Sequence, residues 1–281
     1  MSSEVGARRR VLARLSHVVM YAVVVGLAIT MLFPFAWTLL TSITPGSNLA
    51  TAPELDPSAW SLNSYLTLFA RLDMPTYIFN SVVVSAATTL FQLFTGATAA
   101  YAFARIAFRG RSVIFISYLA TMMIPIQVAI VPLFVQMRAL GLNDSYFALI
   151  APSAASALSV FIMRQAMLSI PQDLDEAATI DGAGHIRIFT QVILPLARPA
   201  LATVGILVFL GSWNSFLWPL VVVRNDALRT LPLGLSTLQG LYSSDWSVIL
   251  AGSIVSILPV VILFAFAQRY FIAGIASTGI K

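Results

Sequence analysis

The stretch IPQDLDEAATIDGAGHIRIFTQVILP, Ile170 to Pro195, is a polar interruption between two long apolar runs. Its first half carries four carboxylates, at Asp173, Asp175, Glu176 and Asp181, and ends in glycines. Acidic side chains are favoured near the positive end of a helix dipole, and glycine permits a sharp reversal of the chain. The stretch therefore predicts two short helices joined by a glycine turn.

The details of this hairpin follow from its prolines, glycines and apolar spacing. Pro171 is suited to the first turn of the leading helix, and Gly182 and Gly184 are expected to make the reversal. After the turn, apolar residues recur every three to four positions and predict one buried face: Ile186, Phe189, Val192 and Ile193. A plain connection between helices needs only about 2 to 8 residues. The length of the segment therefore favours a docking surface for another protein over a simple link.

The composition indicates the class of protein to which the hairpin belongs. The chain has 281 residues, of which 59% are hydrophobic and 10% charged, and its mean hydropathy is +0.89. Soluble domains carry about 25% charged residues, so the sequence indicates an integral membrane protein rather than a nucleic-acid-binding one. There is no cysteine, which excludes disulfides and cysteine-based metal sites.

Six apolar runs are long enough to cross a membrane, which takes about 20 residues. They are Val18 to Leu40, Ser81 to Ala104, Val113 to Met137, Tyr146 to Met167, Ala200 to Val223 and Val248 to Phe271. We expect an all-α membrane domain over residues 18–272, with a core at about 80–272 and the hairpin at 171–195. Residues 1–17 and 273–281 would be terminal segments, and the first run is too long for a cleaved signal.

The basic residues predict how these spans are oriented. Twelve of the sixteen fall on one side of the predicted membrane, and the other side keeps Arg71, Arg138, Arg224 and Arg229. Because positive charge is enriched in cytoplasmic loops, both termini and the hairpin are expected in the cytoplasm.

Several kinds of chemistry are missing from the sequence. No carboxylate lies within a predicted span, which argues against a proton- or sodium-driven carrier. The only lysine is Lys281, so the chain cannot form a Walker A loop. His17 and His185 stand far apart and in no metal-ligand spacing. We therefore expect neither an enzyme nor a cofactor or metal site, and any ATP would be bound by another subunit.

The outside connections contain apolar residues of their own. In SLNSYLTLF, helical spacing predicts a short amphipathic helix with Leu62, Tyr65, Leu66 and Phe69 on one face. That face would lie on the membrane surface, under a partner, or against the protein itself. Polar and aromatic residues inside the spans are candidates for a translocation path: Asn214, Trp213, Trp218, Gln92 and Gln127. The alternative is that the amides bond across helices and the tryptophans lie at the membrane interface.

The hairpin resembles the EAA motif of ABC-importer permeases. Glu176, Ala177 and Ala178 are followed, after three residues, by Gly182 and, after nine more, by the segment 192–195 with the sequence VILP. The family pattern ends in I-x-L-P, so a valine replaces the usual isoleucine. Further stretches resemble the carbohydrate-uptake branch, specifically the maltose-type second permease: LFPFAWTLLTSI, AAYAFARIAFRG and GSWNSFLWPL.

This resemblance implies a type I ABC importer permease fold with six transmembrane helices. The hairpin would contact the ATPase and be fixed to its span through Glu176, Ala177, Ala178, Asp181, Gly182, Val192, Leu194 and Pro195. An extracytoplasmic solute-binding protein would touch the last outside loop at Leu231, Leu238, Tyr242 and Trp246. The other implied partners are a second homologous permease, two ATP-binding subunits that hold ATP and Mg, membrane lipid and the carbohydrate itself.

These observations predict a subunit of a carbohydrate importer in a bacterial plasma (inner) membrane. Two alternatives stay open. In the first, an importer of the same kind would take up glycerophosphodiesters or polyols. In the second, the chain would be a membrane scaffold that transports nothing.

Overall fold

The computed structural model describes residues 2–46, 54–239 and 245–278, with side chains from residue 17 to residue 266 of those ranges. These ranges contain helices and no β-strand. The α-helices are α1 (Ser2–Ile43), α2 (Asn63–Arg71), α3 (Met74–Arg105), α4 (Arg111–Ala120), α5 (Ile126–Ala139), α6 (Tyr146–Ile150), α7 (Ala157–Leu168), α8 (Asp173–Ile180), α9 (His185–Ile188), α10 (Leu194–Leu196), α11 (Arg198–Trp213), α12 (Leu217–Val222), α13 (Leu231–Ser236) and α14 (Trp246–Thr278). The short 3₁₀ segments are η1 (Pro57–Ala59), η2 (Thr121–Met123), η3 (Ala151–Ser153) and η5 (Asp226–Leu228), and η4 (Phe189–Ile193) is a π-helix.

Three of the six predicted spans are continuous helices and three are broken. Apolar helices long enough to cross a membrane occupy 17–43, 74–105 and 246–266. The others are pairs bent by 96° between η2 and α5, by 48° between η3 and α7, and by 77° between α10 and α11. The described residues therefore contain three helices long and apolar enough to span a membrane, or up to six when each bent pair is counted as one span.

The breaks interrupt three of the six predicted apolar runs. Pro125 precedes α5, and the residue before it, Ile124, is extended, as expected for a residue before proline. The predicted fifth span is wrong as a single helix, because α11 ends at Trp213 and α12 begins only at Leu217. Pro219 contributes to this break, since a proline cannot donate the helical hydrogen bond that a continuous helix would need.

The chain falls into two compact units. The first comprises residues 1–71 and 238–255. The second comprises residues 72–237 and 256–281.

In the first unit, α2 follows α1 and is bound to its end. The hydroxyls of Ser42 and Tyr65 share a hydrogen bond of 2.9 Å. The predicted helix in SLNSYLTLF is confirmed as α2, and Leu68 is its fully buried apolar residue. Leu62, Leu66 and Phe69 are instead exposed, so the predicted apolar face is free for lipid or a partner.

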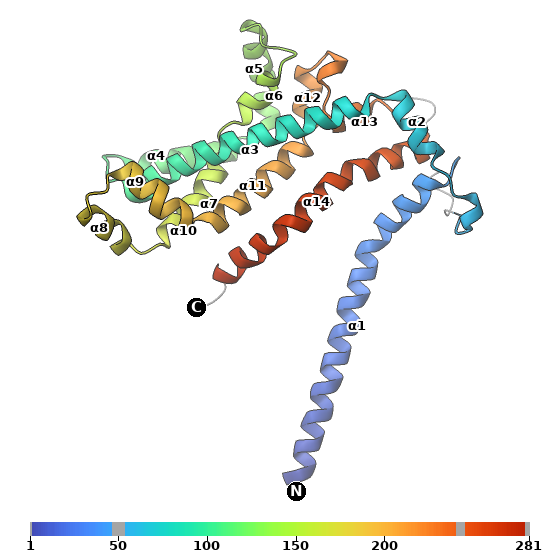
Figure 1. Ribbon diagram of the computed structural model, residues 1–281, viewed down its shortest axis with the longest axis horizontal. Coiled ribbons are helices and arrows are strands. Elements are labelled where there is room, and N and C mark those ends of the chain that lie inside the picture. Colours follow the sequence, from blue (N-terminus) through green and yellow to red (C-terminus); the bar gives the residue numbers. More distant parts are fainter. Residues whose placement is uncertain (1, 47–53, 240–244, 279–281) are drawn as a thin grey trace. The chain divides into compact units, whose positions relative to one another are not determined.

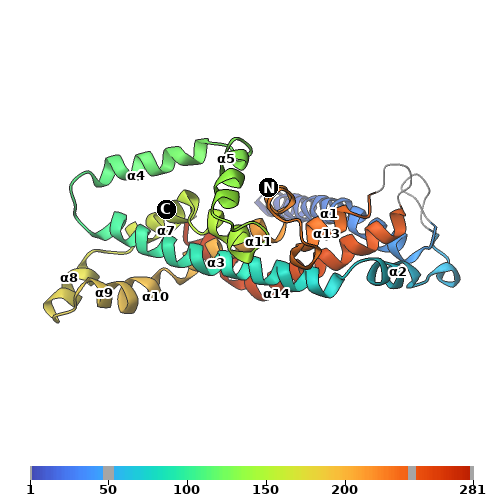
Figure 2. The same ribbon diagram turned by 90° about the horizontal axis from the view of Figure 1, so that it is seen from above.

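In the second unit, the long helix α3 is the central element, and α7 and α11 lie along it (Figures 1 and 2). Their facing side chains form one apolar core, which includes Ala100, Met163 and Val204. The α8–α9 hairpin lies at one end of α3, and η5 and α13 lie at the other (Figure 1). This arrangement places the features described below at the two ends and along the side of one helix.

Candidate functional site

The hairpin folds as two helices around a single left-handed glycine. The first turn of α8 carries Asp173, Asp175 and Glu176, as predicted. The helix ends at Ile180 with Asp181 as its C-cap. The next residue, Gly182, has a φ of +78°, and the amide of Ala183 donates to the carbonyl of Ala178 at 2.9 Å. This is the hydrogen bond of a Schellman motif, in which glycine is strongly preferred.

Gly184 does not take part in the reversal in the same way. Its φ is −78° and its ψ is 168°, a conformation open to any residue. The expectation that both glycines make the turn is therefore corrected, because Gly182 alone adopts the left-handed conformation.

One side of the hairpin is anchored in the core. Ile188 and Ile193 are buried, and Phe189 and Val192 pack against the same cluster. The predicted apolar face is thus confirmed except for Ile186, which is 81% exposed. The π-helix η4 widens the helical turn here. Ile186 is the second residue of α9 and lies before this turn. Leu194 and Pro195 continue this half-buried segment in α10.

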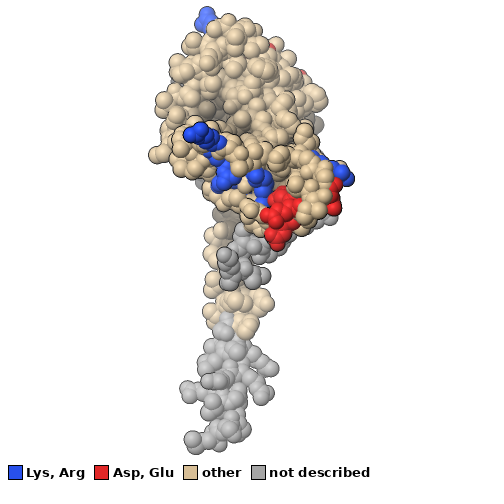
Figure 3. Space-filling model, turned by 90° about the vertical axis from the view of Figure 1, so that its left-hand side faces the viewer, with Lys and Arg blue, Asp and Glu red and all other residues tan. Residues whose placement is uncertain are grey.

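The opposite side of the hairpin is exposed and mixes acidic with apolar groups. Ile180 is 87% exposed, and Glu176, Ala177 and Asp181 are exposed around it. Figure 3 shows the acidic side chains gathered in one patch at this end of the molecule. Ile180, exposed among these acidic groups, is a candidate for contact with another protein.

A nearly buried ion pair fastens the hairpin to the end of α3. The Arg105 guanidinium lies 3.2 Å from the Asp175 carboxylate, and the two side chains are 5% and 20% exposed. Arg105 also donates a 2.7 Å hydrogen bond to the carbonyl of Ile170. Arg164 reinforces the junction through a 3.1 Å hydrogen bond to the carbonyl of Phe103. This pair was not predictable from the sequence, because nothing local in the sequence brings positions 105 and 175 together.

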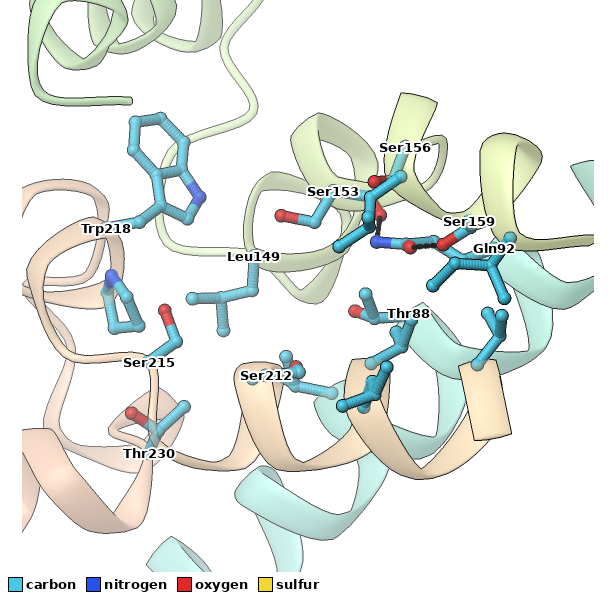
Figure 4. Close-up of a pocket in the computed structure, with 18 residues that line it drawn as sticks. Thr88, Gln92, Leu149, Ser153, Ser156, Ser159, Ser212, Ser215, Trp218 and Thr230 are labelled. Carbon is cyan, nitrogen blue, oxygen red and sulfur yellow. Dashed lines mark hydrogen bonds between the residues drawn. The ribbon is translucent and has the colours of Figure 1, made fainter. Parts of the chain in front are cut away.

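A cavity of about 250 Å³ opens between α3, α7, α11 and the segment that follows α11 (Figure 4). Two of the candidate path residues line it, Gln92 and Trp218. Gln92 connects the helices, because its amide donates to the Ser153 carbonyl at 2.6 Å and accepts from the Ser159 hydroxyl at 2.7 Å.

The other candidate path residues lie elsewhere. Trp213 is buried and its indole donates to the carbonyl of Ser256 at 3.2 Å. Asn214 is exposed and donates back to the carbonyl of Leu210 at 2.9 Å, which caps α11. Gln127 is exposed in the first turn of α5.

At the far end of α3, hydrogen bonds hold the loop between α12 and α13. The amide of Asn80 donates at 2.9 Å to the carbonyls of Ala227 and Arg229 and accepts from the hydroxyl of Tyr146. The backbone amide of Leu231 donates to the Ser81 hydroxyl at 2.7 Å.

Asp144 ties a second loop to the same end. Its carboxylate accepts from the backbone amides of Arg224 and Asn225, the latter at 2.8 Å. These hydrogen bonds hold the pKa of the Asp144 carboxyl below its ordinary value, because they stabilise the charged form.

The candidate contacts for a binding protein have mixed positions. Leu231 is fully buried, so its side chain supports the loop from within. Leu238 and Trp246 belong to the first compact unit and are partly exposed. Tyr242 lies outside the described residues.

The family of this chain follows from its similarity to known proteins. Residues 92–276 match the model of the "binding-protein-dependent transport system inner membrane component" family. The chain belongs to this family. The matched segment contains the hairpin and most of the cavity walls.

Individual relatives cover nearly the whole chain. It is 39% identical over 259 residues to an arabinooligosaccharides transport system permease protein of Bacillus subtilis, which covers 91% of this chain and 92% of the relative. It is 34% identical to a trehalose/maltose transport system permease protein of Thermococcus litoralis, covering 91% and 93%. The structure is similar to that of a chain of a bacterial ABC transporter involved in the import of the acidic polysaccharide alginate, with a TM-score of 0.81, 27% identity and coverage of 92% of this chain and 97% of that one.

Proposed function

We propose that this chain is a permease subunit of an ATP-driven importer that takes up a carbohydrate delivered by an external binding protein. The names of the relatives, which refer to arabinooligosaccharides and to trehalose and maltose, support a carbohydrate cargo. The family description supports the binding protein and an inner-membrane location. A second homologous permease would complete the path, and two ATP-binding subunits would hold ATP and Mg.

The observation that carries this proposal is the hairpin of α8 and α9. It exposes Ile180 and Ile186 beside acidic groups, while its other side is anchored in the core. An apolar group that protrudes from a firmly held element can fill a groove on a partner and transmit a push. In this proposal the groove belongs to the cytoplasmic ATP-binding subunit.

The position of the hairpin in the chain supports this coupling role. It joins the end of α7 to the start of α11, and both helices pack along α3. A displacement of α8 would therefore act on two helices that line the cavity. Since the only lysine is Lys281, the energy of ATP must enter through such a contact.

Glycine substitutions test the proposal directly. A Cβ at position 182 or 184 would meet no atom within 4 Å, so the two positions differ in backbone conformation and not in space. Gly182→Val should abolish most uptake by the reconstituted complex, because a β-branched residue is strongly disfavoured at positive φ. Gly184→Val is the matched control and should transport at close to the normal rate.

Exposed apolar residues give a second test. Ile180→Ser and Ile186→Ser should leave membrane insertion and thermal unfolding unchanged, because neither side chain is buried, and should weaken ATP-driven uptake. Normal uptake in both serine variants and in Gly182→Val would refute the coupling role. If the complex with all its partners accumulates no solute in vesicles, the scaffold alternative is correct. Uptake of a polyol or glycerophosphodiester but of no sugar would show that the transported solute is not a carbohydrate.

A further inference from the structure

The end of α3 contacts both arms of the hairpin. Tyr101 and Arg105 stand four residues apart on α3, so they lie on one face of the helix. The Tyr101 ring lies 5.0 Å, centroid to centroid, from the ring of Phe189, which follows the glycine turn. Arg105 makes its ion pair with Asp175 of α8, which precedes the turn. One helix end therefore holds the two arms together.

These contacts are shielded from water. Tyr101 is buried and belongs to the core cluster against which Phe189 packs. The Arg105 side chain is only 5% exposed, and its guanidinium also binds the carbonyl of Ile170, where the chain enters the hairpin. Opposite charges that lie away from water are weakly screened, and separating them is costly. The hairpin therefore cannot leave the end of α3 without a large loss of free energy.

The chain itself does not join the hairpin to α3. The neighbours of the hairpin in the sequence are α7 and α11, and Ile170 stands 65 positions after Arg105. Near the hairpin, the core face of α3 carries the small side chains of Ala97, Ala100 and Ala104. Small residues let helices approach closely but offer little resistance to sliding, and shear of packed helices is a common motion. Directed contacts are therefore needed for α3 to follow the hairpin.

Directed contacts also hold the far end of α3, at the loop between α12 and α13. The Asn80 side chain donates to the carbonyls of Ala227 and Arg229, and the amide of Leu231 donates to the Ser81 hydroxyl. The hairpin, α3 and this loop belong to one compact unit. Figure 1 shows the hairpin and α13 at opposite ends of α3. The hairpin and the loop are therefore connected through α3 by polar contacts at both of its ends.

We propose that Arg105 and Asp175 form a positioning pair that makes α3 follow the hairpin, so that a displacement imposed by the ATP-binding subunit reaches the loop between α12 and α13. This inference rests on the coupling role proposed above, and it names the side chains that carry the movement into α3. Because coupling between two sites is reciprocal, a partner bound at that loop would in turn change the position of the hairpin.

Replacing the ion pair by an apolar pair separates coupling from stability. Arg105→Met combined with Asp175→Leu fills the junction with apolar groups, which often stabilise a protein as well as a buried ion pair does. The variant loses the directed contacts with α8 and with the Ile170 carbonyl. In vesicles that contain the complete complex, the amount of sugar taken up per ATP hydrolysed should fall by about fivefold or more, as for loss of coupling between two sites.

Arg111→Met is the matched control at the same end of α3. The Arg111 guanidinium donates to the carbonyl of Ile106 at 3.3 Å, and among the described residues it has no hydrogen bond or ion pair with the hairpin. The substitution removes an arginine–carbonyl hydrogen bond and leaves the positioning pair intact. The ratio of sugar taken up to ATP hydrolysed should therefore stay normal.

A probe on the far loop measures the movement itself. The chain has no native cysteine, so Ala227→Cys gives it a single, exposed thiol for an environment-sensitive fluorophore. The complex is assembled from partner subunits without reactive cysteine, and sugar-loaded binding protein is present throughout. A non-hydrolysable ATP analogue should then change the fluorescence when the positioning pair is intact. The change should be several-fold smaller when the chain also carries Arg105→Met and Asp175→Leu.

The two readouts distinguish coupling from simple anchoring. A normal ratio of sugar to ATP in the apolar-pair variant would show that the ion pair only anchors the hairpin, and would overturn the proposal. An undiminished fluorescence change in that variant, or no change with the pair intact, would show that α3 does not carry the movement and would overturn it too.

Failure of this inference differs from failure of the proposed function. If the hairpin has no coupling role, Ile180→Ser leaves uptake normal. If the hairpin couples but the positioning pair does not carry its movement into α3, Ile180→Ser still weakens uptake, while the apolar-pair variant keeps a normal ratio of sugar to ATP.

Discussion

The two ends of α3 are held to the rest of their compact unit by different forces. At the Asn80 end, directed hydrogen bonds fix the loop between α12 and α13. The Asn80 side chain donates to two carbonyls of this loop, and the Asp144 carboxylate accepts from two of its backbone amides. At the Arg105 end, one ion pair and an apolar underside hold the hairpin, while Ile180 and Ile186 protrude. The helix between them is 32 residues long, or about 48 Å at 1.5 Å per residue.

This difference indicates what each end does. Loops with satisfied backbone groups resist local opening, so the Asn80 end presents a rigid surface. The hairpin is also fixed on one side, but its exposed isoleucines are stabilised by nothing in the described structure. A rigid end suits a partner that binds without changing the conformation of the loop. An end with protruding apolar groups suits a partner that binds those groups in a groove and displaces the hairpin.

The largest expected effect is at the rigid end. A Cβ at Gly234 would overlap the ring of Tyr77, so Gly234→Ala must displace either the ring or α13. Overpacking of this kind costs about 1–3 kcal/mol, and we expect the upper part of that range. The midpoint of thermal unfolding of the detergent-solubilised protein measures it.

Gly205→Ala is the control for this substitution. Its Cβ would meet Leu93 at 3.7 Å, an ordinary contact, and alanine favours a helix over glycine. An equal loss of stability in both variants would show that the close approach of α13 to α3 does not hold the rigid end.

The next effect concerns the ion pair at the hairpin end. Removing one partner of a buried pair costs about 3–5 kcal/mol, and we expect about 2 kcal/mol for Asp175→Asn, because Asp175 keeps some contact with solvent. Uptake should fall while the exposed surface of α8 stays intact. Arg105→Met combined with Asp175→Leu should recover stability. A double-mutant cycle measures the coupling, and additive losses would contradict a joint role.

The smallest effect is at Asp144. Asp144→Ala removes two hydrogen bonds to backbone amides and should cost about 1 kcal/mol, as for loss of a helix cap. Because the folded pKa of this carboxyl is lowered, its contribution is fully present above the ordinary aspartate pKa and is lost as pH falls through the lowered value. Limited proteolysis of the loop at neutral and acidic pH measures the change. Asp144 has φ of 52°, so Asp144→Asn, which tolerates that conformation, is the control for backbone strain.

Much of the hairpin was predictable because its signals are local. The acids in the first turn of α8, the left-handed Gly182 and the buried Phe189, Val192 and Ile193 follow from helix dipoles, backbone sterics and periodicity. The prediction was wrong at Ile186, which is exposed in the first turn of α9, ahead of the residues that enter the core. It was also wrong at Gly184, whose conformation is ordinary.

The membrane spans were predictable as apolar runs but not as continuous helices. Hydropathy measures how long a run stays apolar and contains no information on the direction of the helix axis. It therefore missed the break before α12 and the bend between η2 and α5. Proline positions carried part of this information. Whether the candidate path residues line a translocation path stays a prediction, because a polar residue in a span is a general signal. Gln92 and Trp218 line the cavity, whereas Asn214 caps a helix.

The sequence by itself determined that this is a helical membrane protein and that a polar helical hairpin interrupts its apolar runs. Composition, periodicity and local motifs suffice for these conclusions, since each depends on neighbouring residues. Only the tertiary structure decided that Arg105 meets Asp175, that Gly234 lies against Tyr77, and that Trp218 donates to the carbonyl of Ala148. The two residues of each contact lie 70 or more positions apart in the sequence. They meet because of how the helices bend and pack, which no local sequence pattern records.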